Sequence, residues 1–126
     1  MALSYFCIVI AIFIPLFCAG YAKFSAKGYN NRSPREFLEG LEGKAKRAHY
    51  AQLNSYEVFP PFAVGVLAAH QLHAAPQTID VLAVGFVCTR ILYVIFYIQD
   101  QLTLRSIVWS IGLFITVSLF FIGWVR

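Results

Sequence analysis

Two stretches of this chain each run for 20 residues without a charged side chain, from Ala2 to Tyr21 and from Ser106 to Val125. At about 1.5 Å of rise per residue, a helix of this length covers the roughly 30 Å hydrocarbon core of a bilayer. Charged residues make up only 13% of the chain and hydrophobic residues 60%. A soluble domain carries about twice that share of charge, so the composition predicts an integral membrane protein.

Two further apolar stretches lie between these. One runs from Arg47 to Leu72 and is expected to kink at Pro60-Pro61, and the other covers Asp80 to Ile98. The connections after Leu72 and Ile98 are short, which is typical of antiparallel neighbours. We therefore expect an all-α fold with one transmembrane domain, 1–126, built as an up-down four-helix bundle. Its helices are predicted at about 2–22, 47–72, 80–98 and 104–125, with a basic loop at 23–46.

The distribution of basic residues predicts the orientation. Seven of the ten lie in the first loop and at its borders: Lys23, Lys27, Arg32, Arg35, Lys44, Lys46 and Arg47. By the positive-inside rule this loop is cytoplasmic, and both termini lie on the non-cytoplasmic side. The first apolar stretch has no basic residue before it, so we expect it to stay in the mature protein. Without long extensions or a retention signal, the chain fits a bacterial inner membrane better than an endoplasmic reticulum.

Metal and nucleic-acid sites are not expected. The three cysteines lie in apolar stretches without ligand spacing, and His70 and His73 have no third ligand nearby. The basic loop is explained by contact with anionic lipid headgroups. Small residues inside the apolar stretches, Gly65, Gly85 and Gly112, are expected to allow close helix contacts, and Trp109 and Trp124 to anchor the last helix at the interfaces.

Polar residues within the apolar stretches follow helical spacing. They form one face of the second predicted helix and one face of the third: Arg47, Tyr50, Asn54 and Glu57, then Arg90, Tyr93 and Tyr97. In an antiparallel pair Glu57 and Arg90 reach similar depth, roughly 15 and 12 Å from the basic side. Arg105 enters at the start of the fourth helix. Buried ionisable groups usually serve a function, so we expect a polar pocket open to the cytoplasm.

This pocket suits a small soluble ligand with several carboxylates and an amine, because guanidinium groups pair with carboxylates and Glu57 accepts from an ammonium. Two other interpretations remain. Glu57 and Arg90 could form an ion pair that only joins two helices, with the tyrosines as interface residues. Alternatively, the chain could be a small four-helix proton-coupled drug exporter with Glu57 as the transport acid, although Arg90 and the tyrosines would then have no task.

The stretch from Arg47 to Phe62, RAHYAQLNSYEVFPPF, resembles the second-helix signature of the membrane-associated proteins in eicosanoid and glutathione metabolism, the MAPEG family. Its core is Asn54, Glu57, Phe59 and Pro61. The series Arg90, Tyr93, Tyr97 and Arg105-Ser106 is similar to the family's second signature. The resemblance covers essentially the whole chain, which looks like a bacterial microsomal-type glutathione transferase.

The resemblance implies a homotrimer with glutathione sites between neighbouring subunits. It implies a glutathione-dependent transferase or peroxidase. The thiolate of bound glutathione would attack a hydrophobic small molecule or a lipid hydroperoxide that arrives from the membrane lipid. Arg105 matches the arginine that stabilises the thiolate, and Ser106 can donate a further hydrogen bond. The positions that match glutathione contacts are Gln52, Asn54, Glu57, Arg90, Tyr93 and Tyr97.

The chain departs from the family pattern in one respect. Several members have an arginine where this chain has Tyr50, and a phenol adds no positive charge. Arg47, one turn earlier on the same face, is the candidate substitute. The family's basic contact from the first helix is either Lys23 or Lys27. Because the family includes a lipid-binding member without catalysis, a non-catalytic lipid- or glutathione-binding protein is the alternative function.

Overall fold

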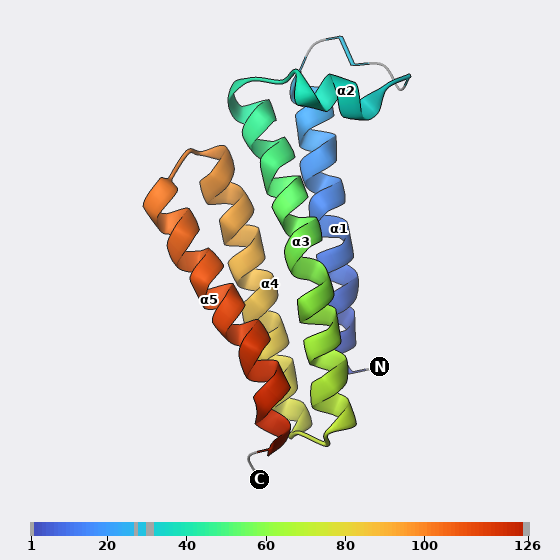
Figure 1. The fold of residues 1–126 in the computed structure, drawn as a ribbon, viewed down its shortest axis with the longest axis vertical. Helices are drawn as coiled ribbons and strands as arrows, with labels where there is room; N and C mark the ends of the chain where they lie inside the picture. Colours follow the sequence, from blue (N-terminus) through green and yellow to red (C-terminus); the bar gives the residue numbers. More distant parts are fainter. Residues whose placement is uncertain (1, 27, 30–31, 125–126) are drawn as a thin grey trace.

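The computed structural model describes residues 2–26, 28–29 and 32–124, and this part of the chain is helical without any strand. Four long helices lie side by side, and one short helix crosses an end of the first two (Figure 1). The helices are α1 (Leu3–Ser25), α2 (Pro34–Glu39), α3 (Gly43–Gln71), α4 (Pro76–Ile98) and α5 (Leu102–Phe121), followed by the 3-10 turn η1 (Ile122–Trp124). Val125, the last residue of the expected fourth helix, lies outside the described residues.

Three helical segments of the described chain are long and apolar enough to cross a membrane: Leu3–Ser25, Pro76–Ile98 and Leu102–Trp124. The fourth long helix, α3, begins with a basic turn and carries Asn54 and Glu57 further along. α4 begins four residues before the expected Asp80, because Pro76 occupies its first turn, where the missing N–H is not needed. Asp80 instead accepts a 2.9 Å hydrogen bond from the main-chain nitrogen of Ser4, at the start of α1.

Small side chains let α1 approach its neighbours. Its buried residues are small, and all but Ala19 recur every three or four positions: Ser4, Cys7, Ala11, Pro15, Cys18 and Ala22. They pack against α3 and α4 along most of the length of α1. Without bulky side chains in this stripe, the helix backbones come close enough for extensive van der Waals contact.

Glycines bring α5 close to two other helices. A Cβ atom on Gly65 of α3 would lie 3.2 Å from Cβ of Leu119, and one on Gly112 of α5 would lie 3.0 Å from Oγ1 of Thr89. A Cβ on Gly85 would meet Ile115 at 3.3 Å. These distances confirm the prediction that the three glycines allow close helix contacts.

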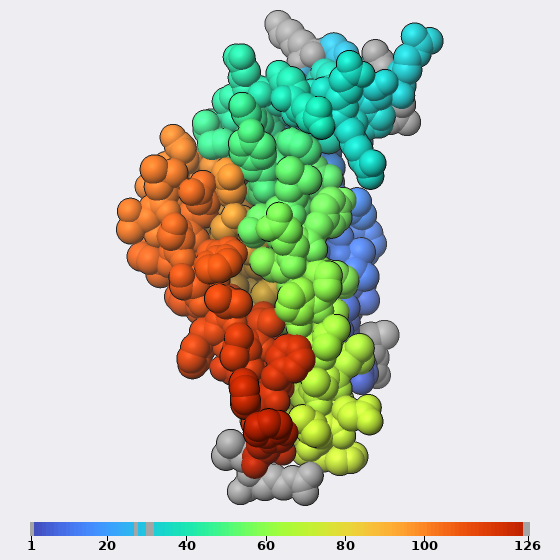
Figure 2. Space-filling view, in the orientation of Figure 1, coloured from blue at the N-terminus to red at the C-terminus, as the bar shows by residue number. Residues whose placement is uncertain are grey.

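The bundle is tighter at one end than at the other. Near the chain termini α5 packs directly on α3, whereas toward α2 the α4–α5 pair leans away from α3 (Figure 1). Figure 2 shows α4 at the bottom of the resulting furrow, between the green α3 and the orange α5. The rings of Phe62 and Phe86 stack in the core with centroids 3.9 Å apart, and Phe86 lines the cavity between α3 and α5. Both described ends of the chain lie opposite α2 (Figure 1).

Candidate functional site

Arg90 is a buried cation in the middle of the bundle, with only 3% of its surface exposed. Its Nη2 donates a 2.7 Å hydrogen bond to Oδ1 of Asn54 and a weaker one, 3.4 Å, to Oγ of Ser55. Its Nε is buried, and no described residue accepts a hydrogen bond from it. A buried guanidinium with one donor left over is costly unless an anion completes its shell.

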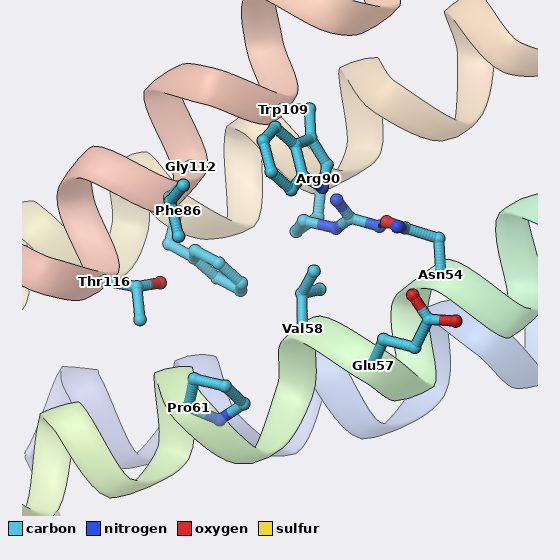
Figure 3. A pocket seen from close by; sticks show the side chains of 10 residues that line it. Asn54, Glu57, Val58, Pro61, Phe86, Arg90, Trp109, Gly112 and Thr116 are labelled. Carbon is cyan, nitrogen blue, oxygen red and sulfur yellow. Dashed lines mark hydrogen bonds between the residues drawn. The ribbon is translucent and has the colours of Figure 1, made fainter.

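The expected contact between Glu57 and Arg90 is not an ion pair in the structure. Both side chains are described and line the same cavity, but the guanidinium donates to Asn54, three residues before Glu57. The two α3 side chains lie next to each other on the wall facing Arg90 (Figure 3). A simple ion pair between α3 and α4 therefore does not explain Glu57.

Two tyrosine rings on one face of α4 lie between two arginines, one on α4 and one on α5. The guanidinium carbon of Arg90 lies 4.1 Å from the centroid of the Tyr93 ring, and the rings of Tyr93 and Tyr97 meet edge to face at 5.6 Å. The guanidinium carbon of Arg105, on α5, lies 4.3 Å from the centroid of Tyr97. Such contacts are attractive because the ring face is negative. We call Arg90, Tyr93, Tyr97 and Arg105 the cation–aromatic row.

Two cavities adjoin this row. The α3–α5 cavity, of about 230 Å³, has a polar end at Asn54, Glu57 and Arg90 and an apolar end at Pro61 and Phe86 (Figure 3). The α4–α5 cavity, of about 420 Å³, is lined by Tyr93, Tyr97, Arg105, Ser106, Trp109 and Ser110. The row thus connects a charged pocket inside the bundle with a second pocket that holds Arg105 and Ser106.

Trp109 lines both cavities, which the sequence did not reveal. We expected this residue as an interface anchor. It follows Arg105 by four positions, so the two share a face of α5, and this spacing was the available signal. Trp109 therefore contributes to the wall of the cavity at Arg90 and to the wall of the cavity at Arg105.

The sequence profile of the MAPEG family matches residues 1–124. The chain belongs to the MAPEG family. This match confirms the resemblance of its two signatures, and no curated protein and no solved structure matches the chain significantly. With three helices able to cross a bilayer, this MAPEG chain is an integral membrane protein of a family whose function is related to glutathione.

Three predicted positions of the MAPEG site lie apart from both cavities. Nε of Arg47 donates a 3.0 Å hydrogen bond to the main-chain oxygen of Ile98, at the last turn of α4. Tyr50 is 42% exposed. Gln52 donates from Nε2 to the hydroxyl of Tyr56 at 3.3 Å. In the single chain none of these three side chains lines either cavity.

Of the two lysines expected as possible MAPEG contacts, only Lys23 belongs to the described residues. Nζ of Lys23 lies 5.1 Å from the ring centroid of Tyr29, in the loop after α1. Lys27 lies outside the described residues.

The distant His70 places Nε2 2.8 Å from the hydroxyl of Ser4, and the described residues contain no group of three potential metal ligands.

Proposed function

We propose that this MAPEG chain is a membrane glutathione transferase or peroxidase that binds glutathione beside Arg90 and activates its thiol at Arg105 and Ser106. One observation carries the proposal. A buried guanidinium with an unpartnered Nε lines the same cavity as the carboxylate of Glu57, and a continuous cation–aromatic row links it to Arg105. An ion pair that only joined two helices would need neither the cavity nor the row that leads to Arg105.

The charges of the site fit a small acidic peptide with a free amine. Arg90 and Arg105 offer guanidinium donors for carboxylate or thiolate, and Glu57 offers an acceptor for an ammonium. Asn54 fixes one side of the Arg90 guanidinium, whose buried Nε has no acceptor among the described residues. The donor set therefore supports glutathione as the bound species.

The exposure of polar residues supports a homotrimer. Glu57 is exposed in the single chain, and Tyr50 is exposed by 42%, although both belong to a helix that packs among apolar neighbours. Exposed ionisable groups at membrane depth are unfavourable, so a neighbouring subunit is expected to cover this face of α3. Each site then lies between subunits, and Arg47, Tyr50 and Gln52 are placed to contact the ligand at its edge.

Glutathione supplies the nucleophilic sulfur when it is bound. A thiol with a pKa of about 8.5 is mostly protonated at neutral pH, and a nearby guanidinium favours release of the proton. The ring of Tyr97 holds the guanidinium of Arg105 at 4.3 Å, and the hydroxyl of Ser106 lines the same cavity and can donate to sulfur. We therefore assign to Arg105 the stabilisation of the negative charge on the glutathione sulfur, and to Ser106 the orientation of that sulfur.

The second substrate is proposed to be an apolar electrophile or a lipid hydroperoxide. Exposed apolar side chains on α5, among them Ile107 and Ile111, face the lipid side of the α4–α5 pair. We place the four long helices across a bacterial inner membrane, with α2 in the cytoplasm. Both described ends of the chain lie opposite α2, which supports termini on the non-cytoplasmic side (Figure 1).

Turnover of a model electrophile by the purified protein tests the proposal. Arg105→Ala is expected to lower kcat by about 100-fold or more, because one stabilising donor for a developing charge is worth this much. Arg35→Ala is the matched control, since it removes the same group from exposed α2. Equal turnover by Arg105→Ala and wild type would contradict the role of Arg105. Wild-type protein that binds glutathione but never turns over electrophiles or hydroperoxides would favour the non-catalytic alternative.

A further inference from the structure

Two consecutive prolines lie inside α3, which continues through them without a break from Gly43 to Gln71. In an α-helix the main-chain oxygen of one residue accepts from the nitrogen four residues later. Proline has no N–H, so Pro60 removes the helical donor for Tyr56, and Pro61 removes the donor for Glu57. Two adjacent carbonyl groups of α3 therefore lack their normal helical partners.

The two carbonyl groups belong to different faces of α3. Glu57 and Pro61 both line the α3–α5 cavity (Figure 3). Because a helical carbonyl points toward the nitrogen four residues on, the Glu57 oxygen is expected on the side of α3 that these two residues share. Pro60 and Tyr56 do not line this cavity, and Tyr56 is 47% exposed. The prolines thus release one acceptor at the cavity and one away from it.

The opposite wall of the same cavity carries the guanidinium of Arg90, which is not fully hydrogen-bonded. Nε of Arg90 is buried and has no acceptor among the described residues. The α3 wall offers the Glu57 carboxylate, and beside it the freed Glu57 carbonyl. A cavity with surplus acceptors on one wall and a surplus cationic donor on the other is complementary to a zwitterion, which has an ammonium and a carboxylate.

We propose that Pro61 turns the main-chain carbonyl of Glu57 into a ligand-binding acceptor, which holds the ammonium of the γ-glutamyl group together with the Glu57 carboxylate. This inference rests on the proposed function, since it takes glutathione as the ligand. An ammonium has three donors and no acceptor, so it can use both oxygens of Glu57 at once. Pro61 acts here through the carbonyl and is a positioning residue.

Pro61→Ala tests this directly in the full-length, detergent-solubilised protein. Alanine restores the N–H, so the Glu57 carbonyl returns to its helical hydrogen bond, and the substitution favours the helix. Calorimetric titration is expected to show at least about tenfold weaker glutathione binding. Pro60→Ala is the matched control, which restores the same kind of bond for Tyr56, and its affinity is expected to stay within about twofold of wild type.

A ligand analogue separates the carbonyl from the shape of the helix. Glutathione with its α-amino group replaced by hydrogen cannot use the Glu57 carbonyl, so wild type and Pro61→Ala are expected to bind this analogue equally. Equal binding of glutathione by wild type and Pro61→Ala would overturn the inference. An equal loss of affinity for glutathione and for the analogue would also overturn it, because the loss would then come from a change in the shape of α3. Wild type that binds no glutathione would instead refute the proposed function, a distinct result.

Isotope-edited infrared spectroscopy provides a second measurement. With carbon-13 placed at the main-chain carbonyl of residue 57, glutathione is expected to lower its stretching frequency in wild type, because a new hydrogen bond forms. In Pro61→Ala the frequency is expected to be low already and to stay unchanged. A wild-type frequency that does not respond to bound glutathione would overturn the assignment of this oxygen.

Discussion

Nη2 of Arg90 lies 2.7 Å from Oδ1 of Asn54, and this hydrogen bond joins α4 to α3 at the most deeply buried cation described in the bundle. The contact orients the guanidinium plane, so that Nη2 bonds to protein while the buried Nε has no acceptor among the described residues. Asn54 thus acts as the fixed support of a cation that also lines the α3–α5 cavity. The stability and the binding capacity of the site are expected to depend on this pair together.

Asn54→Leu is expected to destabilise the protein. The side chains are similar in size, but leucine leaves Nη2 of Arg90 with only the 3.4 Å contact to Ser55. Loss of a hydrogen bond to a buried charge costs about 2 to 3 kcal/mol, so thermal unfolding in detergent should shift clearly downward. The control is Gln52→Leu, whose contacts are long, 3.3 Å to the exposed Tyr56 and 3.4 Å to His49, and its stability should stay within about 0.5 kcal/mol of wild type. Equal stability of both variants would show that Asn54 does not support Arg90.

Tyr97 is expected to act mainly through its ring. Tyr97→Phe keeps a ring face beneath Arg105, so kcat/KM should remain within a few-fold of wild type. Tyr97→Ala removes a contact worth about 1 to 2 kcal/mol in a partly desolvated site, which corresponds to roughly 5- to 30-fold in kcat/KM. If Tyr97→Phe were as impaired as Tyr97→Ala, the hydroxyl rather than the ring would be the functional group.

Trp109 is expected to limit the size of the electrophile. It lines both cavities, so Trp109→Ala should join the α3–α5 and α4–α5 cavities into one larger space. The ratio of kcat/KM for a bulky electrophile to that for a small one should rise. Trp124→Ala, at the far end of α5 and 71% exposed, should leave the ratio unchanged. An unchanged ratio in Trp109→Ala would mean that the electrophile binds elsewhere.

Gly65 is expected to be essential for the contact between α3 and α5. A Cβ there would already lie 3.2 Å from Leu119 and 3.3 Å from Phe120, so Gly65→Leu should destabilise the fold by about 1 to 3 kcal/mol. Gly20→Leu, in α1, is the comparison, because nothing lies within 4 Å of a Cβ at that position. Unfolding temperatures in detergent measure the difference. Two variants of equal stability would show that the helices separate easily here.

Helical periodicity predicted much of the site. Spacings of three and four place Arg90, Tyr93 and Tyr97 on one face, and in the structure they form one row with Arg105. The same spacing could not choose the partner of Arg90. Asn54 and Glu57 are less than one turn apart on α3, so both lie at a suitable depth and on a suitable face to contact Arg90. Only the side-chain conformations in the structure show that Asn54 is the partner.

Other features depended on how the helices end and lean. Arg47 bonds to the carbonyl of Ile98, where α4 ends. The sequence predicted this helix end, but it carried no sign that the side chain of Arg47 reaches it. Trp109 looked like an interface anchor, since tryptophan is common at helix ends in membranes. Its position between two cavities follows from the outward lean of the α4–α5 pair, and hydropathy carries no information about this angle (Figure 1).

The most direct test is the ultraviolet difference spectrum of glutathione bound to the purified protein, recorded about one pH unit below the pKa of the free thiol. The spectrum is predicted to show thiolate absorption that saturates with the bound ligand. Arg105→Ala is predicted to bind glutathione without this absorption. Bound glutathione with the spectrum of a protonated thiol in the wild-type protein would contradict the account.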